Sequence, residues 1–126
     1  QAAKLCNNML LAIHMIGTCE AFTMAQKLGL DPQTFYDISS VSSGQNWSMT
    51  SYCPVPGVGP QSPAGNYYEG GFATTLMLKD LTLALAAAEE AGVEPEMGKR
   101  ARELYESFAA AGNGGRDFSA IIETLD

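Results

Sequence analysis

The sequence is poor in histidine and in basic residues. Its only histidine is His14, and seven Lys and Arg stand against fourteen Asp and Glu, which leaves a net charge of -7 at pH 7. One histidine argues against a His-based metal site and against a Ser-His-Asp triad, so we expect no metal ion and interpret His14 as a packed or solvent-facing residue. The acidic balance argues against nucleic acid and against an anionic membrane as partners, because both attract basic proteins.

Cysteine is also scarce. Cys6, Cys19 and Cys53 are an odd number without a C-x-x-C pair, which argues against a disulfide framework and indicates a reducing, intracellular compartment. Cys6 and Cys19 lie in the first apolar stretch and are expected to behave as small buried apolar side chains. The stretch over residues 9–19 is too short for a bilayer and contains His14, so no membrane-spanning helix is predicted.

What the sequence does contain is helical periodicity. Over residues 3–28, apolar side chains recur at the spacing of one helix face, and Gly29 is typical of the residue just past a helix end. The Asp-Pro pair at 31–32 is typical of the start of a second helix. Residues 72–93 hold a run rich in Leu and Ala that is apolar on nearly every side. Such a run predicts the central, most enclosed helix of the domain.

The rest of the chain adds helices and one long loop. An amphipathic helix is predicted over residues 94–112, and Asp117 is expected to cap a final short helix. The loop over residues 53–71 is rich in Pro and Gly, but its tyrosines indicate an ordered loop that packs on the body. Since no segment alternates like a strand, the sequence predicts one all-α domain, a helical bundle, over residues 1–126.

Lys4 and Asn8 are the first candidate functional pair. At positions i and i+4 of one predicted helix, their side chains point to the same side. An ammonium beside a carboxamide can bind a carboxylate, and a Lys can also act as a general acid or base. The alternative is an ordinary solvated edge at a helix start, and spacing alone favours that alternative.

Lys79 and Asp80 are the second candidate pair, because they interrupt an otherwise apolar helix. Charges at the centre of such a helix require partners or a function. Adjacent residues project in different directions, so each of the two needs a partner of its own. The alternatives are a narrow solvated stripe or an ion pair to the basic residues of the next helix, Lys99, Arg100 and Arg102.

The segments that contain these two pairs resemble segments of a known family. QAAKLCNNMLLAI resembles the end of the GxGxxxKxxxN segment of the β-hydroxyacid dehydrogenases, with Lys4 and Asn8 at the motif Lys and Asn. KDLTLAL resembles the KDLGxA segment of the same family, with Thr82 where Gly is usual. SSGQNWSMTSYCPVPGV and NYYEGGFATTLMLKDL also match, so the resemblance covers nearly the whole chain in the expected order.

This resemblance implies a two-domain enzyme that uses NAD. The chain would be its all-α C-terminal domain, of the type found in 6-phosphogluconate dehydrogenase. An N-terminal Rossmann domain would precede it in a longer protein, and the full protein would form a homo-oligomer. Lys79 would reach the bound NAD, and Asp80 would orient the helix. The 126-residue chain on its own would then lack dehydrogenase activity.

The resemblance also implies roles at the substrate, a small β-hydroxyacid. Lys4 would be the general acid/base and Asn8 would hold the substrate's hydroxyl or carboxylate. Trp47 and Phe72 would wall the apolar side of the substrate, although an aromatic residue such as Trp47 is more often a core anchor. A different small β-hydroxyacid, such as tartronate semialdehyde, remains an alternative substrate. A purely structural helical domain that self-associates remains an alternative function.

Overall fold

A computed structural model describes residues 1–125 of the chain. Its helical elements are α1 (Ala2–Lys27), α2 (Pro32–Ser39), α3 (Trp47–Thr50), η1 (Pro63–Asn66), α4 (Thr74–Glu90), α5 (Glu96–Phe108), η2 (Ala109–Asn113) and η3 (Phe118–Thr124). These residues contain no β-strand, only an isolated bridge between Ala73 and Asp117. The prediction of an all-α domain is therefore confirmed. In this part of the chain, no helix combines the length and the apolar character needed to cross a membrane.

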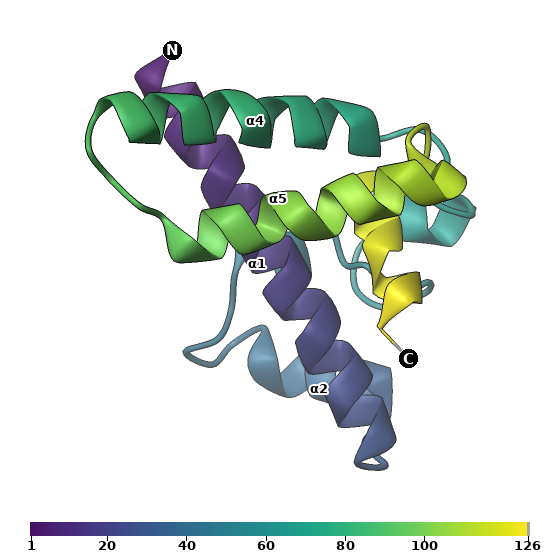
Figure 1. Cartoon of the computed structure of the whole chain (residues 1–126). Coiled ribbons are helices and arrows are strands. Elements are labelled where there is room, and N and C mark those ends of the chain that lie inside the picture. The colour runs from purple at the N-terminus through teal and green to yellow at the C-terminus, as the bar shows by residue number, and fades with distance from the viewer. Residues whose placement is uncertain (126) are drawn as a thin grey trace.

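Two layers of helices cross in the molecule. Figure 1 shows α4 and α5 side by side and antiparallel, with both lying across α1. The N-terminal half of α1 runs beside α4, whereas α2 packs near its other end (Figure 1). The rows of side chains on two packed helices set the angle at which the helices cross. Each neighbouring helix therefore contacts only a short part of α1. The first turns of α1 thereby lie along the C-terminal half of α4, and Asn8 reaches Asp80 near the middle of α4.

Local capping explains where α1 ends and α2 begins. Gly29 takes a φ of 87°, in the left-handed region that ends helices, directly after α1. The Asp31 side chain accepts hydrogen bonds from the backbone N–H groups of Gln33 and Thr34, and Pro32 occupies the first helical position. Both boundaries follow from residues within the same few positions, so the sequence predicts them correctly.

The centre of the domain is α1 and not α4, so the prediction for residues 72–93 was wrong. Seven of the 26 residues of α1 and four of the 17 residues of α4 are buried, so α4 is no more enclosed than α1. Leu76 and Leu83 of α4 are half exposed, at 49% and 48%. The reason is geometric: α1 contacts α2, α3, α4, α5 and η3, whereas α4 packs mainly on α1 and α5. An apolar composition on every side of a helix does not reveal which sides meet a partner.

The long loop is packed on the body, as predicted. Residues 53–71 contribute buried apolar side chains to a second core cluster, which they form with Phe22 and Met49. The hydroxyl of the buried Tyr68 donates a hydrogen bond of 2.7 Å to the Pro54 carbonyl oxygen. The loop is therefore an ordered part of the domain that packs against its core.

The cysteines divide by burial. Cys19 and Cys53 are buried, but Cys6 is exposed, contrary to the prediction. At the N-terminal end of α1, Cys6 lies on an open apolar groove between α1 and α4, which Leu5 and Met9 also line. Its place in an apolar stretch therefore did not imply burial.

Candidate functional site

The two predicted polar pairs meet where α1 crosses α4. Asn8 Nδ2 donates a hydrogen bond of 2.7 Å to Asp80 Oδ2, across 72 positions of sequence. Both residues are half-buried. A hydrogen bond to an ionised acceptor is stronger than a neutral one and is less screened away from bulk water. This bond therefore fixes the orientation of the Asn8 carboxamide.

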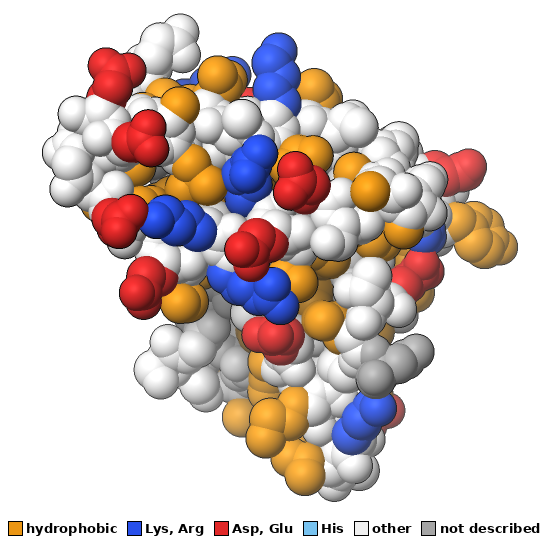
Figure 2. Space-filling view, in the orientation of Figure 1, with side chains coloured by type: hydrophobic (Ala, Val, Ile, Leu, Met, Phe, Trp, Pro, Cys, Tyr) orange, Lys and Arg blue, Asp and Glu red, His pale blue; other side chains and the backbone are white. Residues whose placement is uncertain are grey.

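The structure contradicts the alternative in which Asp80 forms an ion pair with the basic residues of α5. The ion pairs of those residues are Lys99–Glu94, Arg100–Glu103 and Arg102–Glu106. Figure 2 shows the result, with charges of both signs interspersed over α5. The basic side chains of α5 thus pair with acidic residues near them in sequence, and Asp80 receives its hydrogen bond from α1 instead.

Lys4 and Lys79 lie on the exposed side of this crossing. Both are exposed, and none of the four ion pairs within residues 1–125 includes either of them. Lys4 stands one helical turn before Asn8 and on the same side of α1. An ammonium without an internal partner is available to an external acid, hydroxyl or phosphate.

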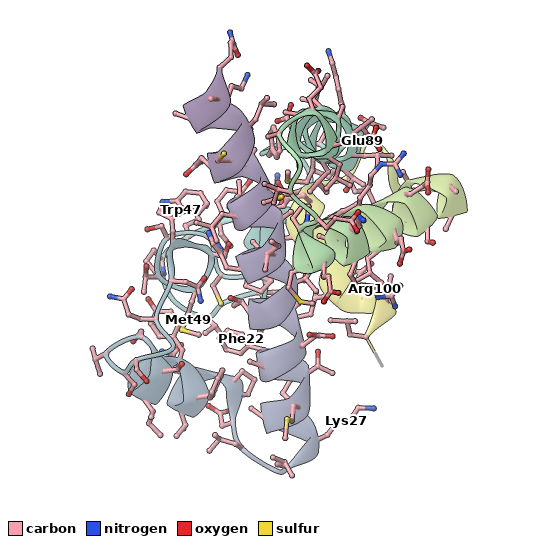
Figure 3. All side chains as sticks on the ribbon, turned by 60° about the vertical axis from the view of Figure 1, so that its left-hand side comes forward. Phe22, Lys27, Trp47, Met49, Glu89 and Arg100 are labelled. Carbon is pink, nitrogen blue, oxygen red and sulfur yellow. The ribbon has the colours of Figure 1, made fainter. Side chains whose placement is uncertain are left out.

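A hollow opens beside the crossing. It has a volume of about 320 Å³ and is lined by Asn7, Leu11, His14 and Trp47, and we call it the Trp47 hollow. Asn7 Nδ2 donates to Asn8 Oδ1 at 3.3 Å, which joins the hollow to the Asn8–Asp80 pair. In Figure 3, Trp47 lies on one side of α1 and α4 lies on the other. The site therefore extends around the exposed face of α1.

Trp47 is a wall of this hollow and not a core anchor. Its side chain is 49% exposed, and its ring stacks on Tyr52 with centroids 5.2 Å apart and planes 24° apart. Phe72, by contrast, does not line the hollow. It is half-buried and packs edge-on against Phe118, with ring centroids 5.6 Å apart. The structure thus brings Trp47 to the site more directly than Phe72.

His14 is a site residue that sequence reasoning missed. Its Nδ1 lies 2.7 Å from the hydroxyl of the fully buried Ser48, and its ring forms part of the hollow. The spacing in the sequence could have indicated this, because Asn7, Leu11 and His14 stand at i, i+4 and i+7 and therefore share one face of a helix. Within residues 1–125, no group of His, Cys, Asp and Glu is arranged to hold a metal ion.

Burial lowers the pKa of His14 below its ordinary value of 6.5. The folded chain thus binds this proton less readily than the unfolded chain, so the free energy of unfolding should fall as pH drops below 6.5. Because His14 is the only histidine, one NMR imidazole signal reports its titration without ambiguity. We expect a midpoint below 6.5. We also expect it to stay below 6.5 in Ser48→Ala, since burial is the cause, and a midpoint at or above 6.5 in the unaltered chain would contradict this.

Together, the fold and this site define an all-helical domain with an open site of polar and aromatic side chains. Residues 1–125 hold no strand followed by a glycine-rich loop and a helix, the unit that binds a dinucleotide. A family model described as "NAD-binding of NADP-dependent 3-hydroxyisobutyrate dehydrogenase" matches residues 1–125. The chain therefore belongs to this family.

Individual relatives agree with that assignment. The chain is 46% identical over 125 residues to the probable 3-hydroxyisobutyrate dehydrogenase of Mycobacterium tuberculosis, and 48% identical over 125 residues to the mitochondrial 3-hydroxyisobutyrate dehydrogenase of Homo sapiens. Each comparison covers 99% of this chain but only 42% and 37% of the respective relative. The chain thus spans less than half the length of these relatives.

Solved structures show the same fold. The 3-hydroxyisobutyrate dehydrogenase of Mycobacterium tuberculosis with L-serine superposes with a TM-score of 0.95 at 46% identity, over 99% of this chain and 43% of that one. A 3-hydroxyisobutyrate dehydrogenase from Salmonella typhimurium reaches a TM-score of 0.82 at 23% identity, over 97% of this chain and 40% of that one. The second likeness concerns the fold alone.

Proposed function

We propose that the chain is the C-terminal domain of an NAD-dependent dehydrogenase that oxidises 3-hydroxyisobutyrate to methylmalonate semialdehyde, a step in valine breakdown. The observation that carries the proposal is the hydrogen bond between Asn8 and Asp80, which joins the two motif segments at one site. Lys4, one turn away and exposed, is the proposed general acid/base. The names of relatives at 46% and 48% identity support the choice of reaction.

The proposed protein has a second domain. Its relatives are more than twice as long as the chain, and we assign the remainder to an N-terminal Rossmann domain that binds most of the NAD. The residues described here fit a supporting role only: Lys79 presents an exposed ammonium on α4 that suits a phosphate oxygen. Buried Cys19 and Cys53, neither in a disulfide, agree with a reducing compartment, either bacterial cytoplasm or mitochondrial matrix.

The chain's own residues can provide the proton chemistry. In the oxidation, Lys4 Nζ would accept the proton of the substrate hydroxyl, and in the reverse direction it would return that proton. Bound NAD supplies the hydride acceptor. Asn8 uses one N–H for Asp80, so its second N–H remains to donate to the substrate's hydroxyl or carboxylate. Asp80 would act on the substrate only through Asn8, by keeping the amide turned the right way.

A second candidate substrate is favoured by the lining of the Trp47 hollow. Beside Leu11 and Trp47, the hollow presents the Asn7 carboxamide and the His14 ring, which can hydrogen-bond a substituent. A hydroxyl at that place, as in glycerate and tartronate semialdehyde, would use these groups, whereas the methyl group of 3-hydroxyisobutyrate would not. The related reaction is therefore the reduction of tartronate semialdehyde to glycerate.

Initial rates of the full-length enzyme distinguish these substrates. If the site prefers the methyl group of 3-hydroxyisobutyrate to the hydroxyl of glycerate, kcat/KM for 3-hydroxyisobutyrate should be higher by roughly 10–200-fold. This is the discrimination typical of a small apolar contact. The same assay with NAD and with NADP identifies the preferred cofactor. A kcat/KM that is higher for glycerate would overturn the proposed substrate and favour the second candidate.

A domain that serves only self-association is the remaining alternative. Leu76, Leu83 and Met97 expose apolar surface on α4 and α5, which is the observation in its favour. We propose that the full protein is a homo-oligomer, but such a role does not require Lys4 or the Asn8–Asp80 bond. Replacing Lys4 therefore distinguishes the two functions, because it should impair a dehydrogenase but not a domain that only self-associates.

A further inference from the structure

We propose that Asp117 is a positioning residue for the substrate site, because one oxygen of its carboxylate holds Tyr52, the ring on which the Trp47 wall stacks, and also the backbone of Phe72. This inference rests on the proposed function, in which the substrate contacts the Trp47 hollow. Asp117 itself does not line the Trp47 hollow and is fully buried, with 0% of its surface exposed. It would act on the substrate only through Tyr52 and the backbone of Phe72.

The two oxygens of Asp117 have separate partners. Oδ1 accepts the Tyr52 hydroxyl at 2.6 Å and the Phe72 backbone N–H at 2.7 Å. Oδ2 accepts the Ser119 backbone N–H at 3.0 Å and also the Ser119 hydroxyl. The Oδ2 bonds are the local cap of η3 and involve residues two positions away. The Oδ1 bonds reach 65 and 45 positions back along the chain, so capping does not explain them.

Asp117 lacks a basic partner among the described residues. The four ion pairs of residues 1–125 do not include it, and the neighbouring Arg116 pairs with Glu123 at 2.6 Å. A buried carboxylate without a counter-ion depends on hydrogen-bond donors for its stability. The four donors are therefore held firmly around it, and two of them come from Tyr52 and Phe72.

The connection from Asp117 to the Trp47 hollow runs through one ring. Tyr52 donates its hydroxyl to Asp117 and stacks its ring on Trp47, at 5.2 Å between centroids. Burial raises the pKa of the Tyr52 phenol, and the hydrogen bond to Asp117 adds to this, so the phenol remains a donor at neutral pH. Trp47 is half exposed and stacks on this ring, so a displaced Tyr52 would release it.

A single-tryptophan measurement tests the inference. Trp47 is the only Trp of the chain, so its fluorescence reports its own surroundings. Tyr52→Phe removes the bond to Oδ1 but keeps the ring and the η3 cap, whereas Asp117→Ala would remove the cap as well. In Tyr52→Phe, the fraction of displaced Trp47 should rise by roughly tenfold, as expected for the loss of one hydrogen bond to a charged acceptor. Acrylamide quenching and fluorescence anisotropy measure that fraction.

Ser119→Ala is the matched control, because its hydroxyl also bonds to Asp117 but through Oδ2. Quenching and anisotropy should stay unchanged in this variant. Equal effects of the two variants, or no effect of Tyr52→Phe in a chain that keeps its far-ultraviolet circular dichroism, would overturn the inference. A changed signal in Tyr52→Phe alone supports it.

The enzymatic consequence is measured separately in the full-length protein. Tyr52→Phe should raise KM for the β-hydroxyacid, by up to about tenfold, and leave kcat within about twofold, because only molecules with Trp47 in place bind the substrate well while the proton transfer is unaffected. A released Trp47 with an unchanged KM would overturn the link to the substrate site. An unaltered enzyme that oxidises no β-hydroxyacid would refute the proposed function, yet the fluorescence result would still decide whether Asp117 positions Trp47.

Discussion

Replacing Lys4 by Ala in the full-length enzyme is expected to lower kcat by roughly 10²–10⁴-fold, the usual contribution of a general acid or base. Lys4 is exposed one turn before Asn8, whose carboxamide Asp80 holds in place. Removing its amine leaves the substrate hydroxyl without a base to take its proton in the oxidation. The affinity for NAD should change little, because the proposed Rossmann domain provides most of that binding. Steady-state rates and calorimetric titration with NAD provide the two measurements.

Lys27→Ala is the matched control for this experiment. Lys27 is also an exposed lysine of α1, but it lies in the last turn of the helix, far from the crossing with α4. Its replacement removes the same charge and should leave kcat within about twofold. Retention of full turnover by Lys4→Ala would remove the basis for the proposed mechanism. That result would favour the self-association domain, for which Lys4 has no role.

Gly71→Ala is expected to have the largest effect on stability. Gly71 has a φ of 68°, and a Cβ atom at this position would overlap Asp117 Oδ1 and the Tyr52 hydroxyl. The backbone conformation and the collision together should lower the free energy of unfolding by roughly 2–5 kcal/mol. Urea denaturation followed by circular dichroism measures the change. Because the collision falls on the Oδ1 side of Asp117, the Trp47 fluorescence should change as well.

Gly70→Ala separates the two causes. Gly70 has nearly the same backbone conformation, with a φ of 76°, but a Cβ atom there would meet nothing within 4 Å. This variant should lose only the backbone component, about 1–2 kcal/mol, and should keep the Trp47 signal. Equal losses for the two variants would mean that the space around Asp117 tolerates a methyl group. The packing described for Gly71 would then be wrong.

Features with local causes could be predicted from the sequence. The end of α1 at Gly29, the start of α2 at Asp31 and the cap at Asp117 each depend on hydrogen bonds within a few positions. The class of fold followed from periodicity over whole segments. The motif residues Lys4 and Asn8 were recognised by resemblance, since their spacing alone favoured a solvated helix edge.

Features that depend on which helices meet could not be predicted. The sequence placed α4 at the centre and Cys6 in the core, whereas α1 is central and Cys6 is exposed. It interpreted His14 as a packed or solvent-facing residue and assigned it no place at the site, although its ring lines the hollow. In each case the error concerns the side of a helix that finds a partner. Periodicity shows that a side is apolar, but not which other segment covers it.

The sequence by itself therefore determined the helices, their ends and the residue types available for chemistry. Only the tertiary structure decided that Asn8 bonds to Asp80, that Trp47 walls a hollow, and that Asp117 reaches both Tyr52 and Phe72. The physical reason is the range of the interactions. Helix formation and capping act over three or four positions, whereas the site depends on the angles and depths at which distant segments pack.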